Sequence, residues 1–234
     1  MKYYSLIALL FAETVYSHAT WNNFFVDGKA SKECLRVVST NSPTTNLASP
    51  DLRCGPGGAK PAASSCAVKA GSKIEMQMHQ QPGDLSACPP KNNPAIGGRH
   101  FGPVMVYMCE VADAATSSGD CSWVKVAEDA YTGTESSWGT EVLNNNCGKR
   151  AYTIPKSLKS GNYLIRAEAL ALHSQPGQSY IACSQINVTG GGSTKLPAGV
   201  KFPGAYTATE VNKNIWVSNL KYTAPGPKVW AATA

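Results

Sequence analysis

Several features typical of common protein classes are missing from this chain of 234 residues. After residue 17, no apolar run approaches the roughly 20 residues that a membrane-spanning helix needs, so we expect no membrane partner. The formal net charge is +6, but no run of Lys and Arg exceeds two residues, which argues against a nucleic-acid partner. The eight cysteines include no CxxC pair, which argues against a structural zinc site.

Histidine is also scarce, and the position of the first one is informative. A short apolar run, 5–12, follows a basic residue and has the length typical of a secretory signal peptide. Val15 and Ser17 are the small residues that a signal peptidase accepts before its cleavage site. We therefore expect 1–17 to be removed and a secreted, extracellular chain to begin at His18. The alternative is a buried first helix, with cleavage at another position.

The remaining residues, 18–234, suit one all-β domain. Strand-like runs recur at spacings of roughly ten residues and almost no helical periodicity is present, which predicts an immunoglobulin-like or fibronectin-like β-sandwich. Segments 39–63, 80–99 and 128–148 are rich in turn-forming or polar residues, so we predict loops there. The predicted strands are 20–26, 34–38, 73–79, 104–111, 122–127, 151–154, 163–172 and 178–188.

The even number of cysteines, in a chain with a secretory signal, predicts disulfide bonds. Cys109 and Cys121 flank a Gly/Ser-rich connection between two predicted strands, so they are well placed to join a hairpin. Spacing alone leaves the pairing of the other six cysteines open.

A chain that begins at His18 offers a metal ion two nitrogen donors from one residue. Its α-amine and imidazole close a six-membered chelate ring, and one further imidazole gives three nitrogens. Such donors, with open coordination positions, suit Cu(II). Because the amine has a reference pKa of roughly 7.7–8.0, copper must displace a proton, and we expect affinity to fall at acid pH. The other histidines, His79, His100 and His173, are not at metal-motif spacing.

Motifs along the whole of 18–234 occur together in one known family. They are HAT at 18–20, HFGPV at 100–104, SWVK at 122–125, ALALHS at 169–174, QSYIACSQ at 178–185, FPGAY at 202–206 and YTAPGP at 222–227. In their order and residues, the chain resembles fungal lytic polysaccharide monooxygenases of auxiliary activity family 9, formerly glycoside hydrolase family 61. No linker to a separate carbohydrate-binding module is present, so we expect a single catalytic domain.

This resemblance implies a copper site on a flat face formed by long loops. His18 and His100 are implied as the copper ligands, and Tyr180 as the axial ligand. His173 and Gln178 are implied as the neighbours that hydrogen-bond oxygen species at the metal, so His173, Gln178 and Tyr180 become the candidate catalytic residues. Gln178 and Tyr180 lie two apart in a predicted strand and therefore share a face. Taken alone, His173 would be a histidine at a strand end and Tyr180 a core residue.

The resemblance also suggests residues that contact the substrate. Tyr222 matches the exposed tyrosine that stacks on a glucose unit, although it could equally be a loop aromatic packed on the sandwich. Asn41 and His79 lie in segments that approach the same face, and His79 could equally be an exposed strand residue.

The family's common disulfide is implied between Cys54 and Cys183, and a second joins Cys34 to Cys66. Cys88 and Cys147 are then the pair left over. Two segments depart from the family pattern, the short connection 173–178 and the long segment 80–99, and both border the implied substrate face. They put the substrate and the site of oxidation in question, but not the copper ligands.

The implied activity is oxidative cleavage of a β-1,4-glucan such as cellulose, by hydroxylation at C1 or C4. It requires one copper ion, an external electron donor and O2 or H2O2, and we expect a monomer. One alternative is a hydrolase, which needs two opposed carboxylates, but the chain has only 15 acidic residues and no motif is centred on a pair. Another is a secreted protein that binds copper or polysaccharide without catalysis.

Overall fold

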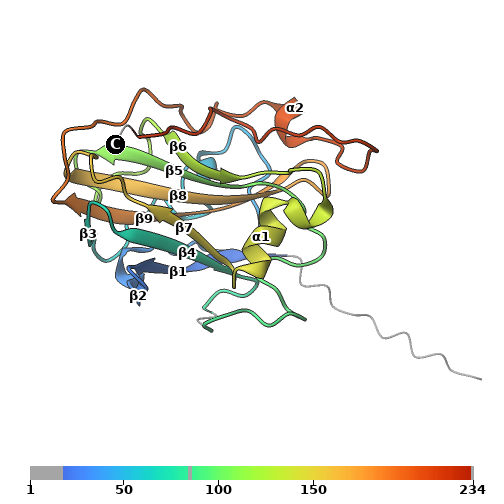
Figure 1. Ribbon diagram of the computed structural model, residues 1–234, viewed down its shortest axis with the longest axis horizontal. Coiled ribbons are helices and arrows are strands. Elements are labelled where there is room, and N and C mark those ends of the chain that lie inside the picture. The colour runs from blue at the N-terminus through green and yellow to red at the C-terminus, as the bar shows by residue number, and fades with distance from the viewer. Residues whose placement is uncertain (1–17, 84–85, 233–234) are drawn as a thin grey trace, which may run out of the picture.

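The computed structural model describes residues 18–83 and 86–232, in which two β-sheets pack face to face (Figure 1). One sheet has four strands in the order β2-β1-β4-β7, and the other has five in the order β3-β9-β8-β5-β6. The predicted β-sandwich is therefore confirmed. The predicted signal peptide, 1–17, lies outside the described residues.

The strands differ in length, and the longest two lie side by side in the five-stranded sheet. The four-stranded sheet comprises β1 (Thr20–Val26), β2 (Lys29–Ala30), β4 (Lys73–His79) and β7 (Lys149–Thr153). The five-stranded sheet comprises β3 (Cys66–Lys69), β5 (Val104–Val111), β6 (Val124–Asp129), β8 (Gly161–Ala171) and β9 (Gln178–Thr189). The helices are η1 (Lys32–Cys34), η2 (Pro50–Leu52), η3 (Glu135–Ser137), α1 (Gly139–Asn145) and α2 (Ala208–Val211).

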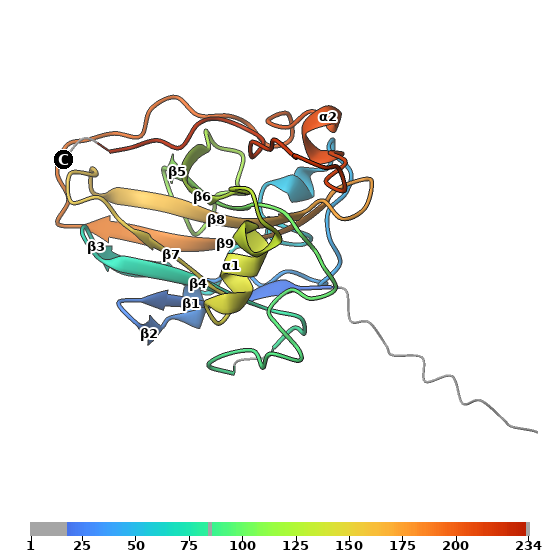
Figure 2. The same ribbon diagram turned by 45° about the vertical axis from the view of Figure 1, so that its right-hand side comes forward.

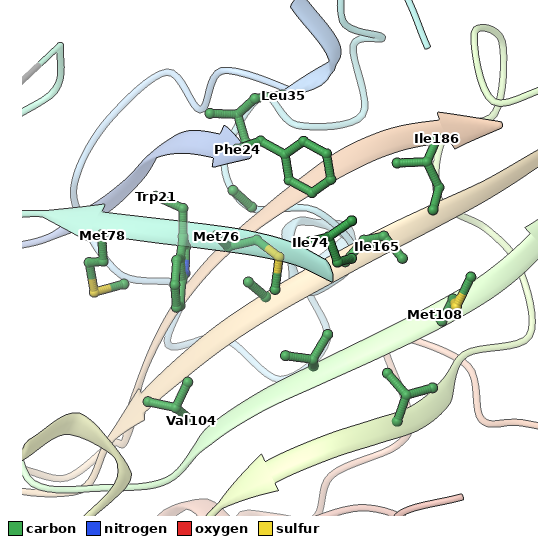
Figure 3. Packing of buried hydrophobic residues seen from close by; sticks show 14 of the residues in the cluster. Trp21, Phe24, Leu35, Ile74, Met76, Met78, Val104, Met108, Ile165 and Ile186 are labelled. Carbon is green, nitrogen blue, oxygen red and sulfur yellow. The ribbon is translucent and has the colours of Figure 1, made fainter. Parts of the chain in front are cut away.

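The main core lies between the two sheets (Figure 3). Trp21 and Phe24 of β1 and Met76 of β4 meet Ile165 of β8 there, and each is at most 2% exposed. Apolar residues alternate along β4, which turns one face of that strand toward the other sheet. In β1 the register shifts between Trp21 and Asn23, so Trp21 and Phe24 both contribute to the core although they are three residues apart. Burial of this apolar surface is the main force that holds the sheets together.

A second apolar layer covers the other face of the five-stranded sheet. The C-terminal tail supplies part of it, because Phe202 and Tyr206 pack edge-on against each other and Phe202 packs in the same way on Tyr107 of β5. Strand β5 is consequently buried on both faces from Val104 to Cys109. This explains why its sequence is a continuous apolar run without alternation.

A charged pair lies inside this second layer. Arg166 and Glu168 of β8 form a salt bridge at 2.7 Å, and both side chains are 0% exposed. Tyr206 donates a hydrogen bond of 2.5 Å to Glu168 Oε2, and the Tyr206 and Tyr107 hydroxyls are 2.9 Å apart. The tail is thus attached to the sheet by a buried polar network as well as by apolar contacts.

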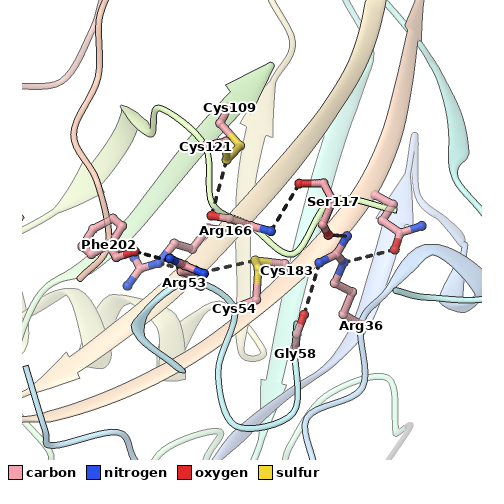
Figure 4. The surroundings of a disulfide bond; sticks show 12 residues. Arg36, Arg53, Cys54, Gly58, Cys109, Ser117, Cys121, Arg166, Cys183 and Phe202 are labelled. Atoms are coloured by element: carbon pink, nitrogen blue, oxygen red, sulfur yellow. Dashed lines mark hydrogen bonds between the residues drawn. A yellow bond between two sulfur atoms is a disulfide. The ribbon is translucent and has the colours of Figure 1, made fainter. Parts of the chain in front are cut away.

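Four disulfides join the loops to the sandwich: Cys34–Cys66, Cys54–Cys183, Cys88–Cys147 and Cys109–Cys121. These are the pairs named from the sequence. Figure 4 shows the Cys54–Cys183 bond with Arg36 and Arg166 near it. The buried Arg36 guanidinium donates to the Gln185 side chain and to the carbonyls of Gly58, Ala114 and Ser117, which ties three loop regions to β9.

Seven of the eight predicted strands correspond to observed ones, with bounds that match or shift by one or two residues. The predicted strand 34–38 is wrong: η1 ends at Cys34, and Leu35 makes only an isolated bridge to Ser184. The loop predicted over 128–148 is also wrong, because it contains η3 and α1. Strands β2 and β3 were not predicted, since each is too short for a periodic pattern. Within the described residues, no helix has the length and apolar character needed to cross a bilayer.

We predict that Glu168→Gln lowers the free energy of unfolding by about 3–5 kcal/mol, because it leaves the Arg166 charge buried without its counter-ion. At roughly 2–4 °C per kcal/mol, the melting temperature falls by roughly 6–20 °C, measurable by calorimetry with the disulfides intact. The matched control is Glu110→Gln, which breaks the 2.8 Å pair with Lys159 on the surface. It should cost less than ~1 kcal/mol. Equal melting temperatures for the two variants would contradict the prediction.

Candidate functional site

The predicted site residues gather at one end of the sandwich, where β1 begins, β8 ends and β9 begins. Figure 2 shows the β8–β9 connection at this end, beside the part of the tail that carries α2. Gln178 is the first residue of β9 and pairs with Ala171, the last residue of β8. The turn between them carries His173, so three candidate residues, with Tyr180, come from one strand pair.

His100 is brought to this end by a close approach between backbones. Phe101 and Pro103 accept hydrogen bonds from the Leu172 and Leu170 amides, at 2.7 and 3.0 Å. A Cβ atom at Gly102 would lie 1.7 Å from the Leu170 carbonyl oxygen, so only glycine permits this contact. Segment 100–103 is therefore fixed against the end of β8, with His100 next to the turn that carries His173.

The aromatic rings of the site are in contact. The His100 and His173 ring centroids lie 4.0 Å apart with an interplanar angle of 44°, and the Tyr180 ring stands edge-on to His100 at 6.0 Å. Tyr180 donates a hydrogen bond of 2.9 Å to Gln178 Oε1. The structure thus brings His100, His173, Gln178 and Tyr180 into one cluster.

His18 is exposed and lies two residues before β1. The start of β1 is fixed near the cluster, because Trp21 Nε1 donates a hydrogen bond of 3.0 Å to the Tyr180 carbonyl. The backbone therefore brings the beginning of the described chain to the strand that carries Tyr180.

Burial favours the neutral forms of the site residues. It lowers the pKa of His173 and raises that of Tyr180 well above its usual value, because the charged form of each would lose contact with water. Above the lowered pKa of His173, its imidazole is uncharged and Tyr180 remains a phenol. Within the described chain, the buried His173 Nδ1 has no hydrogen-bond partner. Neutral imidazole and phenol groups, with one buried nitrogen left to bond, fit a copper ion better than a hard cation that prefers carboxylates.

Trp216, which no motif in the sequence indicated, lies beside this cluster and is 51% exposed. Its indole Nε1 donates to the His173 carbonyl at 3.4 Å, and its ring lies 6.0 Å from Phe101. The Arg99 guanidinium stands over the same ring at 4.8 Å. The sequence offers only one signal for Trp216, an aromatic residue in a tail without periodicity, and the family resemblance points to Tyr222 in the same tail.

Tyr222 does not occupy the exposed position expected of it. Its ring packs edge-on against buried Trp138 at 5.0 Å, and its hydroxyl is buried without a partner among the described residues. Burial raises the pKa of this phenol far above its usual value. The alternative stated from the sequence, a loop aromatic packed on the sandwich, describes Tyr222 correctly.

His79 is 0% exposed, so both expectations for it, a substrate contact and an exposed strand residue, are wrong. The outer face of β4 is covered: Gln77 donates hydrogen bonds to the carbonyl of Ala87, in the segment after β4, and to that of Cys147, shortly after α1. Asn41 is half-buried, and its side-chain amide donates to the Gln80 carbonyl at 3.1 Å. Its contact with substrate stays a prediction.

The chain is similar to one known family, and to several known proteins, along most of its length. The model of Auxiliary Activity family 9 (formerly GH61) matches residues 18–224, a range that contains every residue of the cluster. AA9 family lytic polysaccharide monooxygenase E of Botryotinia fuckeliana is 46% identical over 230 residues, covering 95% of each chain. AA9 family lytic polysaccharide monooxygenase B of Thermothielavioides terrestris is 44% identical, over 99% of this chain and 74% of the relative.

Solved structures show the same fold. The crystal structure of HiLPMO9B superposes with a TM-score of 0.77 at 31% identity, and covers 91% of this chain and 99% of its own. The structure called CvAA9A gives a TM-score of 0.80 at 25% identity, with coverage of 91% and 98%.

Proposed function

The chain belongs to auxiliary activity family 9, the lytic polysaccharide monooxygenases, and we propose that it cleaves β-1,4-glucan, cellulose above all, with one copper ion held by His18 and His100. It is a polysaccharide monooxygenase and therefore an oxidoreductase. The observation that supports the proposed site best is the stacking of His100 on His173 at 4.0 Å, next to the Tyr180–Gln178 hydrogen bond.

The proposed site depends on processing of the chain. Removal of 1–17 would convert the peptide nitrogen of His18 into an α-amine, which can bind a metal as an amide cannot. The mature domain would then begin at His18, and we propose that it is secreted and monomeric. The exposure of His18 and its position two residues before β1 are compatible with both cleavage and metal binding.

His18, through its amine and imidazole, and His100, through its imidazole, would hold the copper, with the Tyr180 phenol as a further ligand. When bound, copper supplies the one-electron chemistry by which an external electron donor and O2 or H2O2 lead to hydroxylation of the sugar at C1 or C4. The chain's own contribution is to orient these ligands and to restrict what approaches them.

The two neighbouring side chains would act on the oxygen co-substrate. Gln178 Oε1 accepts a hydrogen bond from the Tyr180 hydroxyl, which orients the amide and leaves its Nε2 hydrogens for another acceptor. His173 is neutral once the pH exceeds its lowered pKa, and its buried Nδ1 can accept or donate a proton according to the tautomer. We propose that these two groups bind and protonate oxygen species at the site.

Trp216 would contact the substrate in place of Tyr222. Its indole is 51% exposed and borders the cluster, because it bonds to the His173 carbonyl. A flat indole face suits the apolar face of a glucose ring, and the Arg99 guanidinium on the same ring restricts its orientation. An open surface of this kind accommodates a polymer lying across it.

We predict that the mature protein, given copper, a reductant and H2O2 or O2, releases oligosaccharides from cellulose that carry an oxidised C1 or C4, detected by mass spectrometry. A chelator should abolish this release and added copper should restore it. Release of unoxidised sugars in the presence of chelator would instead indicate a hydrolase. Copper binding without oxidised products on several glucans would indicate a non-catalytic binding protein.

We predict that one Gly residue added before His18 weakens copper binding by at least about a hundredfold, because changes outside the ligand set already cost roughly 10–100-fold. Isothermal titration calorimetry gives the affinity, and electron paramagnetic resonance gives the ligand field. The control carries the same extra Gly after Ala234 and should bind copper as the mature chain does. Equal affinities for the two extended chains would exclude the His18 amine as a ligand.

We predict that Trp216→Ala reduces adsorption to cellulose about tenfold, equivalent to ~1.4 kcal/mol, while the copper spectrum is retained. Tyr222→Leu, which keeps apolar packing against Trp138, should leave adsorption unchanged and lower the melting temperature. Adsorption isotherms on crystalline cellulose measure both. If the Tyr222 variant lost adsorption and the Trp216 variant kept it, the assignment would be reversed.

A further inference from the structure

A groove lies beside the histidine cluster, between the segment that precedes His100 and the region of η3 and α1. Its larger part encloses about 650 Å³, and its lining includes Arg99, Glu135, Glu141 and Asn144. This volume is within the roughly 300–1,000 Å³ of small-molecule sites in proteins. Phe101, which directly follows His100, lines the groove as well, so the groove borders the proposed metal site.

A second hollow, of about 300 Å³, continues the first. Phe101 and Glu135 line both, and the walls of the second include Tyr131, Trp138 and Trp216. A polar part therefore leads into an aromatic part that ends at the exposed indole beside His173. Hydrogen-bonding groups next to flat aromatic faces match the two kinds of surface of a sugar, its hydroxyl rim and its apolar ring face.

The wall formed by segment 86–99 is fixed in place. Asn144 of α1 exchanges two hydrogen bonds with the backbone of Ile96, at 2.9 and 3.0 Å. The Cys88–Cys147 disulfide joins the same segment to the residues after α1, and Gln80 donates to the Pro94 carbonyl at 2.9 Å. A preformed wall reduces the entropy that ligand binding must offset.

The charges of the groove balance. Lys91 and Arg99 contribute two positive charges, Glu135 and Glu141 contribute two negative ones, and Arg99 pairs with Glu135 at 2.7 Å. A groove with no net charge favours a neutral ligand over an anionic or cationic one, because a charged ligand gains no net attraction. Carboxylate, amide and guanidinium groups together offer both acceptors and donors to hydroxyls.

We propose that this groove binds a neutral glycosyl branch carried by the glucan chain, so that the protein prefers branched β-1,4-glucans with neutral side-chain sugars. This inference rests on the proposed function, since the backbone of the same polymer must pass Trp216 and His100. Residues 91–99, which belong to the stretch that departs from the family pattern, would then serve as the wall that recognises the branch.

The test compares two soluble ligands with the same number of backbone glucose units, a linear cello-oligosaccharide and one bearing xylosyl branches. Isothermal titration calorimetry with the mature chain should give about tenfold tighter binding of the branched ligand. Asn145→Phe places a bulky side chain in the groove from an exposed position on α1. It should lower the affinity for the branched ligand to that for the linear one, and leave the linear one unchanged. Val142→Phe is the matched control, since Val142 is 41% exposed on the same helix and does not line the groove.

A second variant, Glu135→Ala, removes a carboxylate that lines both hollows and should reduce the preference for the branched ligand several-fold. Equal affinity of the wild-type chain for the two ligands would overturn the inference. So would a decrease in affinity in Asn145→Phe that is the same for the branched and the linear ligand. Failure of the proposed function gives a different result, namely no oxidised products from cellulose with any of these proteins. If the wild-type chain forms oxidised products but does not prefer the branched ligand, the proposed role of the groove is rejected and the proposed function is retained.

Discussion

The end of β8 is the constraint on which the site depends. Its last residues are bonded to β9 on one side and to segment 101–103 on the other, and the approach is so close that a side chain at Gly102 would collide with the Leu170 carbonyl. This contact determines where His100 stands, while the β8–β9 pairing determines where Gln178 and Tyr180 stand. A residue larger than glycine at 102 would have to move the whole segment, and with it one imidazole of the cluster.

The layers behind the site make this geometry rigid. The five-stranded sheet is covered on both faces, and the buried Arg166–Glu168 pair joins it to the tail through Tyr206. That tail continues to Trp216, which reaches the His173 carbonyl. The groove is fixed in a similar way, by Asn144 and by Cys88–Cys147. Loops form both the surface around Trp216 and the wall of the groove, and each of these loops is attached to a buried strand or helix.

The sandwich could be predicted from the periodicity of its long strands, whereas the cluster of His100, His173, Gln178 and Tyr180 was implied only by the resemblance to a known family. It failed where burial depends on distant segments. His79 was expected at a surface, as a substrate contact or as an exposed strand residue, yet it is 0% exposed and the segment after β4 covers the polar face of that strand. Tyr222 and Trp216 both occur in a tail without periodicity, and only packing against Trp138 and His173 distinguishes them. Helix α1 has seven residues, too few for a clear amphipathic repeat.

The four disulfides cross-link the middle of the chain but not its two ends. The loops closed by Cys34–Cys66 and Cys54–Cys183 overlap, and the other two bonds lie within the second, so every residue from 34 to 183 is inside at least one covalent ring. The two ends of the chain are outside all of them. His18 and Trp216, one at each end, are consequently held only by non-covalent contacts, whereas His100, His173 and Tyr180 sit within the cross-linked portion. The short stretches around His18 and Trp216 can therefore open locally while all four disulfides stay in place, whereas displacement of His100, His173 or Tyr180 acts against a covalent cross-link.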